Sequence, residues 1–230
     1  ILRNANIVTS VSPWHQNILA KYNANTHLIY NGYDANVFLP KDLICDYFYI
    51  TYLGKLYSTQ LRDPRLLFEA LRQLTSEEKI DSKHIRVLFH TDPNGMHQLQ
   101  DLGAYYQIAP LLNINGYIPR QAILPVMYQS SILLVLTTLS TPKGTHGIMG
   151  TKFFENIGIE KPILCVRSDE ECLADAIQKT HAGLAASHVE EVKAFILDKY
   201  QEWLQNGFTR QAVVNKEQFS RQKQAQQFEQ

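Results

Sequence analysis

The sequence predicts an α/β protein built around a doubly wound parallel sheet. Short apolar stretches alternate with segments whose apolar residues recur at helical spacing, and this alternation continues through most of the 230 residues. The strand-like stretches are apolar throughout, which is typical of parallel strands that are covered on both faces. A series of such strands, each followed by a helix, indicates the βαβ units of a doubly wound domain.

The N-terminal part predicts a small strand–helix–strand unit. The stretch Ile7-Val-Thr-Ser-Val-Ser12 is strand-like, and Pro13 suits the first turn of a helix that reaches about residue 22. The stretch His27-Leu-Ile-Tyr30 is a second strand, closed by the turn-forming pair Asn31-Gly32. A polar connection then leads into the larger part of the chain.

The larger part predicts a repeated strand-and-helix pattern. The strands are expected at Tyr47–Leu53, Ile85–Phe89, Leu111–Tyr117, Ile132–Leu136 and Pro162–Val166. The helices that follow them are expected to begin at about Pro64, Pro93, Pro119, Thr151 and Asp169. Beyond Ala186 we expect a helix over about Val189–Gln205 and a polar final helix from about Phe208 to Gln230.

Composition excludes several classes of protein. The 22 basic and 22 acidic residues cancel, so the chain lacks the positive field that gathers nucleic acid. No run of 18 apolar residues predicts a membrane span. Three cysteines without metal or redox spacing favour a reducing cytoplasm. The chain begins at Ile1 without a signal-peptide pattern, and we expect it to be a piece of a longer protein.

A glycine loop that opens a helix predicts an anion site. Gly147-Ile148-Met149-Gly150 presents bare backbone N–H groups just before the helix that begins at Thr151. Glu155 lies one turn inside that helix. A loop of this kind with one acid fits the diphosphate and ribose of a nucleotide.

Two cations are expected at the same edge of the sheet. Lys55 follows the first core strand and Arg62 precedes the next helix, and ligands of open α/β sheets bind beyond the carboxyl ends of the strands. No G-x-G-x-x-G follows that strand and no G-x4-G-K-[ST] is present, which argues against a dehydrogenase and a P-loop NTPase.

Five segments, in register along the chain, resemble family 4 of the retaining glycosyltransferases, which have the GT-B fold. Ala5–Ser12 resembles "ADxVxxVS", and Ile29–Asp34 with Phe38–Pro40 resembles "IPNGVDxxxFxP". Tyr52–Leu56, Arg62 and Leu66–Ala70 are similar to "VGRLxxxKGxxxLLEA", Asn115–Pro119 to "FxGxVP", and Phe153–Ile163 to "xxLEAMAxGxPVI". The resemblance implies a Rossmann-like sheet in the C-terminal, donor-binding half of such an enzyme.

The resemblance also implies roles for single residues. Lys55 and Arg62 would be the catalytic pair that binds the donor diphosphate, and Glu155 would hold the ribose hydroxyls. The loop would face the donor sugar and diphosphate through its backbone, and Gly116 and Tyr117 would contact the base. The donor-binding residues implied in this way are Gly54, Gly116, Tyr117, Gly147, Ile148, Met149, Gly150, Thr151 and Glu155. Gly147 stands where most members carry a glutamate, and the adjacent His146 is a candidate to replace it.

The resemblance divides the chain into three parts. Residues 1–40 would be the remnant of an N-terminal acceptor domain and linker, 41–206 the donor-binding domain, and 207–230 a helix that crosses back to the missing domain. The implied reaction transfers a hexose from a UDP- or GDP-sugar, without a metal or other cofactor and with retention, to a saccharide or lipid-linked acceptor in polysaccharide biosynthesis. The parent enzyme would be cytoplasmic, with peripheral membrane association, and the isolated chain inactive. A non-catalytic nucleotide-binding module and a GT-B-fold nucleotide-sugar epimerase remain the alternatives.

Overall fold

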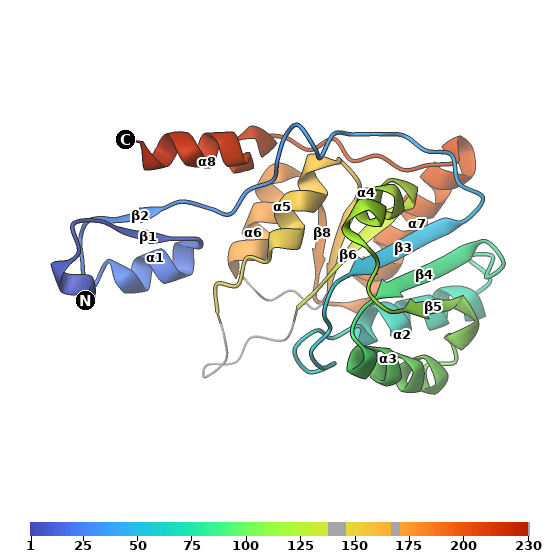
Figure 1. Cartoon of the computed structure of the whole chain (residues 1–230). Coiled ribbons are helices and arrows are strands. Elements are labelled where there is room, and N and C mark those ends of the chain that lie inside the picture. The colour runs from blue at the N-terminus through green and yellow to red at the C-terminus, as the bar shows by residue number, and fades with distance from the viewer. Residues whose placement is uncertain (138–145, 167–170, 230) are drawn as a thin grey trace.

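The computed structural model describes residues 1–137, 146–166 and 171–229. Figure 1 shows a large α/β body and, beside it, a small strand–helix–strand unit close to both termini. The small unit consists of the 3-10 helix η1 (Leu2–Asn4), strand β1 (Val8–Ser10), helix α1 (Pro13–Leu19) and strand β2 (Thr26–Leu28). Its two strands are parallel, so the unit predicted near the N-terminus is confirmed.

A parallel sheet of six strands forms the centre of the large body. Its strands are β3 (Phe48–Leu53), β4 (Ile85–His90), β5 (Leu112–Asn115), β6 (Ile132–Leu136), β7 (Ile163–Val166) and β8 (Gly183–Ala186). The helices between and after them are α2 (Arg65–Ser76), α3 (Pro93–Tyr105), the 3-10 helix η2 (Ala109–Leu111), α4 (Arg120–Gln129), α5 (Thr151–Gly158), α6 (Glu171–Thr180) and α7 (Val189–Asn206). The doubly wound α/β fold predicted from the sequence is confirmed.

The sheet grows in both directions from β3. The strand order is β5-β4-β3-β6-β7-β8, so β4 and β5 lie on one side of β3 and the later strands on the other. Ile50 of β3 pairs with Val87 of β4 and with Ile132 of β6. In such a sheet a crevice opens at the carboxyl ends of the two strands where the order reverses, which here are β3 and β6.

Apolar clusters attach helices to both faces of the sheet. One cluster joins the sheet to α2, α3 and α7, and its members include Phe48, Leu67, Phe89, Leu99 and Ile196. A second cluster joins the opposite face to α5 and α6, and its members include Val135, Phe153, Ile157, Ile163 and Ile177. Burying each side chain of this size contributes about 1.5–3 kcal/mol to folding. Helix α5, which carries the predicted anion site, is therefore firmly seated on the sheet.

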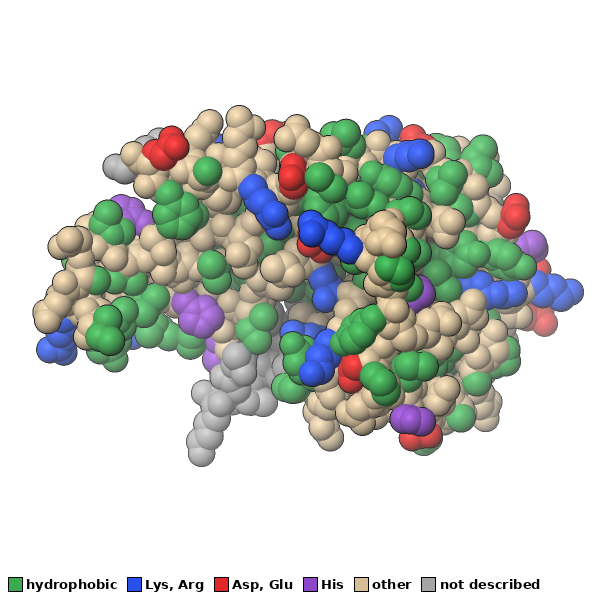
Figure 2. All heavy atoms as spheres, viewed as in Figure 1, with side chains coloured by type: hydrophobic (Ala, Val, Ile, Leu, Met, Phe, Trp, Pro, Cys, Tyr) green, Lys and Arg blue, Asp and Glu red, His purple; other side chains and the backbone are tan. Residues whose placement is uncertain are grey.

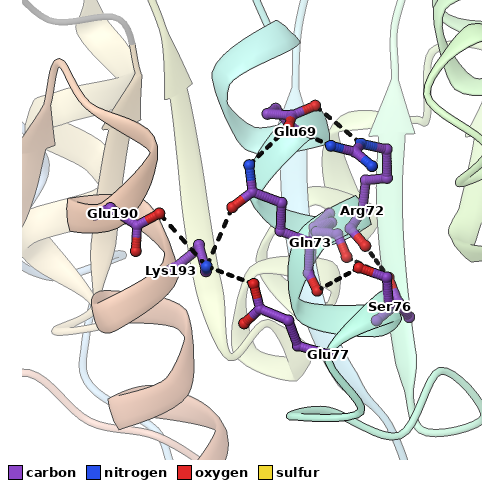
Figure 3. A network of polar contacts seen from close by, with 9 residues as sticks. Glu69, Arg72, Gln73, Ser76, Glu77, Glu190 and Lys193 are labelled. Carbon is purple, nitrogen blue, oxygen red and sulfur yellow. Dashed lines mark hydrogen bonds and ion pairs between the residues drawn. The ribbon is translucent and has the colours of Figure 1, made fainter.

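A polar network links α2 to α7 (Figure 3). The Lys193 ammonium of α7 donates to Gln73 Oε1 (3.1 Å) and Glu77 Oε1 (2.8 Å) of α2, and to Glu190 Oε1 of its own helix (3.4 Å). The Lys193 side chain is 12% exposed, so these oxygens replace much of its water. The network fixes the helix that follows the predicted Lys55–Arg62 segment.

The prediction of a single final helix from about Phe208 to Gln230 is wrong in its first half. The segment after Gly207 is not helical, and helical structure resumes only at the 3-10 helix η3 (Lys216–Phe219) and α8 (Arg221–Phe228). Thr209 is fully buried in that segment, and its hydroxyl donates to the Ser131 carbonyl at 2.5 Å. These contacts with the large body replace the intrahelical hydrogen bonds that a helix would have made.

Strand β8 is absent from the sequence-based prediction, because small residues with low strand propensity form most of it. Gly183 opens the strand at φ +152°, and a Cβ there would lie 2.0 Å from the Ile163 carbonyl oxygen. Only glycine permits this approach of the two backbones. The strand conformation of β8 therefore depends on contact with β7 and not on the sequence pattern of β8.

Candidate functional site

The candidate site occupies the crevice at the carboxyl ends of β3 and β6. A cavity of about 800 Å³ there is lined by the cations Lys55, Arg62 and Lys152. An adjoining cavity of about 690 Å³ is more apolar and shares Lys152 and Thr151 with the first. Figure 2 shows Lys and Arg side chains around a hollow near the middle of the face in view.

The three cations contact aromatic rings in place of carboxylates. Lys55 Nζ lies 4.8 Å and Arg62 Cζ 6.0 Å from the centre of the Tyr57 ring, and Lys152 Nζ lies 5.7 Å from that of Tyr52. Within the described part of the chain, no carboxylate forms an ion pair with any of the three. The crevice therefore holds concentrated positive charge that an anion can neutralise.

Lys152 is a site residue that the sequence analysis missed. It is the second residue of α5, and burial lowers the pKa of its ammonium group. Glu155 opposes this shift and Arg62 adds to it. Gly54 makes room for the side chain, because a Cβ on Gly54 would lie 2.3 Å from Lys152 Nζ. A lysine in the first turn of a helix that follows a glycine loop was the available signal, because the helix dipole disfavours a cation at that position.

The N-terminus of α5 faces both cavities. Gly150 is its N-cap, so no side chain accepts a hydrogen bond from the N–H groups of the first turn. Thr151, the first helical residue, is exposed. Thr151 lines the cationic cavity, the apolar cavity and a third cavity against α8, so the three meet at this helix end. The backbone N–H groups of a first helical turn favour negative charge, which adds to the field of the cations.

In the loop before α5, residues 147–150, some residues line the crevice and others pack elsewhere. Ile148 and Gly150 line the cationic cavity. The Met149 side chain is instead 5% exposed and packs in the second apolar cluster. Gly147 lies against the first turn of α1, and the adjacent His146 stacks on Trp14 with ring centres 5.3 Å apart.

The contact between Gly147 and α1 predicts the effect of restoring a side chain. Gly147 has φ +69°, and a Cβ would lie 2.8 Å from Ser12 Oγ and from Trp14 Cβ. Gly147→Ala and Gly147→Glu should each lower the free energy of unfolding by about 1–3 kcal/mol, measured by urea denaturation. Gly116→Ala is the matched control, since nothing lies within 4 Å of a Cβ there. Equal stability of Gly147→Glu and wild type would contradict this packing.

The apolar cavity combines ring surfaces with one acid. Tyr117, Ile123 and Met127 line it, and Glu155 and His90 contribute the polar groups. Burial raises the pKa of the Glu155 carboxyl, and the nearby cations, Lys152 first among them, oppose the rise. The cavity therefore places one carboxyl group beside a mainly apolar wall.

Gly116 lies close to the residues that line the apolar cavity. Gly116 is exposed next to the cavity, and its carbonyl lies 3.3 Å from His90 Nδ1. Gly54, Tyr117, Thr151 and Glu155 all line the apolar cavity. The structure thus gathers these residues, together with Lys55 and Arg62, around two adjoining cavities.

Tyr52 organises the floor of the cationic cavity. It is 1% exposed, and its hydroxyl donates to the Lys55 carbonyl at 2.9 Å. Burial raises the pKa of the Tyr52 phenol to about 12, although Arg62 acts in the opposite direction. The phenol therefore stays protonated at neutral pH and remains a hydrogen-bond donor.

Asp92 holds the loop that carries Lys55. Its carboxylate accepts hydrogen bonds from the Leu56 N–H (3.0 Å), the Gly95 N–H (3.3 Å) and the Thr91 hydroxyl (3.1 Å), and it caps α3. Burial works against its ionisation, but these hydrogen bonds outweigh burial and hold the pKa of Asp92 below its ordinary value.

Asp92→Ala should therefore destabilise both the helix cap and the loop. We expect the free energy of unfolding to fall by about 1–3 kcal/mol, while the exposed Asp101→Ala on the same helix changes it by less than about 0.5 kcal/mol. Because the folded-state pKa lies below the ordinary 3.8, the Asp92 contribution is present above about pH 4 and is lost as pH falls through the folded-state value. Urea denaturation at pH 7 and pH 3 measures it; a difference as large at pH 3 as at pH 7 would contradict the assignment.

Solved structures of similar fold exist, although no protein-family model and no curated protein sequence matches the chain. Anabaena HepE, solved in complex with UDP-glucose, has a TM-score of 0.70 and 15% identity over 98% of this chain and 64% of its own. Sucrose-phosphate synthase from Thermosynechococcus elongatus has a TM-score of 0.69 and 16% identity, over 99% of this chain and 58% of its own. WaaG, a glycosyltransferase involved in lipopolysaccharide biosynthesis, has a TM-score of 0.61 and 12% identity, over 86% of this chain and 56% of its own. The chain has the fold of one half of a GT-B glycosyltransferase.

This GT-B half spans 64% of HepE, 58% of the synthase and 56% of WaaG, and at these identities the likeness concerns the fold. None of the described helices is long and apolar enough to cross a lipid bilayer. Among the residues that the structure describes, no three His, Cys, Asp or Glu side chains are grouped as a metal site would require.

Proposed function

We propose that the crevice binds the nucleotide-sugar donor of a retaining glycosyltransferase of family 4. The observation that carries the proposal is the group of cations formed by Lys55, Arg62 and Lys152. Each lies near an aromatic ring, none forms an ion pair with a carboxylate of the described residues, and all three line the cavity beside the bare N-terminus of α5. A diphosphate carries the charge and the oxygens that such a site neutralises. The fold supports the proposal, since HepE was crystallised with UDP-glucose.

The two cavities suit two parts of the donor. The diphosphate would lie in the cationic cavity, against Lys55, Arg62 and the backbone of Ile148 and Gly150. The ribose would extend toward Glu155, and the base would reach Tyr117 in the apolar cavity, next to Gly116. The donor sugar would then lie near the Gly147 end of the loop. UDP and GDP are both compatible with a base held largely by main chain.

The chemistry follows from where charge develops. The bond between the anomeric carbon and the phosphate oxygen breaks, and its electron pair leaves with the nucleoside diphosphate. Lys55 and Arg62 neutralise this charge, and one such preorganised donor contributes about 3–4 kcal/mol to a transition state. The acceptor hydroxyl attacks from the same face, and its proton passes to the departing phosphate oxygen, so configuration is retained. The reaction in this form requires neither a metal nor another cofactor.

The acceptor would be bound by a further domain of the same protein. We infer a saccharide or lipid-linked acceptor in polysaccharide biosynthesis, a cytoplasmic enzyme with peripheral membrane association, and no transfer by the isolated chain. Residues 1–40 would belong to the acceptor domain and its linker, 41–206 to the donor domain, and 207–230 to the segment that returns to the missing domain. Consistent with such a return, α8 lies on the same side as β1 and β2 in Figure 1.

Product analysis of the full-length protein tests the proposal. With UDP- or GDP-hexoses and an extract of saccharide and lipid-linked acceptors, we expect nucleoside diphosphate release and an α-linked product from an α-linked donor, detected by NMR. A change of the sugar without an acceptor would favour the epimerase. Binding of the nucleotide sugar without turnover would favour a non-catalytic module, and an inverted product would contradict retention.

A further inference from the structure

Tyr57 adopts a backbone conformation that a tyrosine rarely takes. Its φ is +63°, in the left-handed region that glycine and asparagine favour. It lies between β3 and α2, in the loop that carries both Lys55 and Arg62. A bulky residue persists in such a conformation only where its surroundings enforce it, and such residues gather at functional sites.

Hydrogen bonds from α3 and the residues before it enforce this conformation. The Asn94 side-chain amide donates to the Tyr57 carbonyl at 3.3 Å. On one side of Tyr57, the Leu56 N–H donates to Thr91 Oγ1 (3.1 Å) and to the Asp92 carboxylate. On the other side, the Thr59 N–H donates to Gln98 Oε1 at 2.9 Å. The loop is therefore held from both ends, and the Tyr57 backbone has little freedom to relax.

The Tyr57 ring is not needed to fill the core. Tyr57 is 53% exposed and lies at the wall of the cationic cavity. Lys55 Nζ is 4.8 Å and Arg62 Cζ 6.0 Å from its ring centre, both within the range of cation–π attraction. One ring thus lies near two like charges that repel each other. Arg62 has a second partner, since its guanidinium also donates to the Leu61 carbonyl at 2.9 Å.

We propose that Tyr57 is a positioning residue for anion binding, whose ring holds Lys55 and Arg62 at the cavity wall before the ligand arrives. The inference rests on the proposed diphosphate site and adds to it the group that preorganises its cations. Preorganisation lowers the cost of ordering two long side chains when the anion binds. The left-handed backbone conformation of Tyr57 is tolerated because it brings the ring within reach of both cations.

Three substitutions separate the ring from the backbone and the hydroxyl. Tyr57→Phe keeps the ring, Tyr57→Ala removes it, and Tyr57→Gly removes it while relieving the left-handed strain. Calorimetric titration with inorganic pyrophosphate, the simplest diphosphate, should give a dissociation constant raised about 5- to 30-fold in the Ala and Gly variants. Tyr57→Phe should stay within about twofold of wild type. Tyr105→Ala, at a tyrosine that is 78% exposed on α3, is the control and should change nothing.

The outcomes distinguish the inference from the proposed function. Wild-type affinity for pyrophosphate in Tyr57→Gly would overturn the role of the ring, as would Tyr57→Phe binding as weakly as Tyr57→Ala. Failure of the wild type to bind pyrophosphate would overturn it as well. UDP binding no tighter than pyrophosphate would instead contradict the nucleotide site, while the comparison among Tyr57 variants on pyrophosphate would still stand.

Discussion

Replacing Lys55 and Arg62 together by methionine is expected to weaken UDP binding by about 10²–10⁴-fold. A charged hydrogen bond contributes about 1.5–3 kcal/mol, and two of them act on one diphosphate. Methionine keeps the length and apolar stem of both side chains, and with Lys55 exposed the fold should tolerate the change. Calorimetry of the chain with UDP measures the loss.

The same experiment has internal controls. Lys79→Met with Lys83→Met removes two charges from the exposed connection between α2 and β4 and should change UDP affinity by less than about threefold. Raising the ionic strength should weaken UDP binding in wild type more than in the double variant, because the variant has lost the charges that salt screens. UDP affinity within threefold of wild type in the Lys55/Arg62 variant would refute the phosphate role of this pair.

Glu155→Gln is expected to separate stability from binding. Under the proposed function, ionised Glu155 would accept hydrogen bonds from two ribose hydroxyls, so the neutral amide should weaken UDP binding by about 10- to 100-fold. The ligand-free variant should nevertheless melt at a higher temperature than wild type at pH 7. The reason is that burial raises the pKa of Glu155, so the ionised carboxylate is held in the fold at a cost.

The pH dependence of this effect has a definite sign. A carboxyl whose folded-state pKa is raised stabilises the fold fully below its unfolded value, and this contribution is lost as pH rises through the folded-state pKa. The stability difference between Glu155→Gln and wild type should therefore grow as the pH rises above about 4, and it should level off above the folded-state pKa. Melting curves across that range measure it, with the exposed Asp101→Asn as the control. A variant that is less stable at pH 7 and binds UDP normally would show that Glu155 has a structural role only.

The sequence predicted the parts of the fold that have a local cause. Apolar strands such as Ile132–Leu136 and Ile163–Val166 are buried on both faces, so their composition reveals them. Strand β8 and the segment around Thr209 escaped prediction because contacts with distant residues, Ile163 and Ser131, decide their conformation. The local sequence pattern does not reveal contacts with residues that are distant in the chain.

The site shows the same division. Lys55, Arg62 and Glu155 could be found from strand ends and a helix start, since those positions meet at one edge of the sheet. Lys152 was missed because its position depends on the space beside Gly54, and Tyr57 because neither its backbone conformation nor its neighbours is visible in sequence. Met149 was placed with the loop as a whole, but its side chain turns into the core.

Calorimetric titration of this chain with UDP and with uridine tests the central claim most directly. If the cations and the α5 N-terminus form a diphosphate site, UDP should bind at least about 100-fold more tightly than uridine, since the two ligands differ only in the diphosphate. If UDP bound no more tightly than uridine, and GDP no more tightly than guanosine, the diphosphate site would be contradicted.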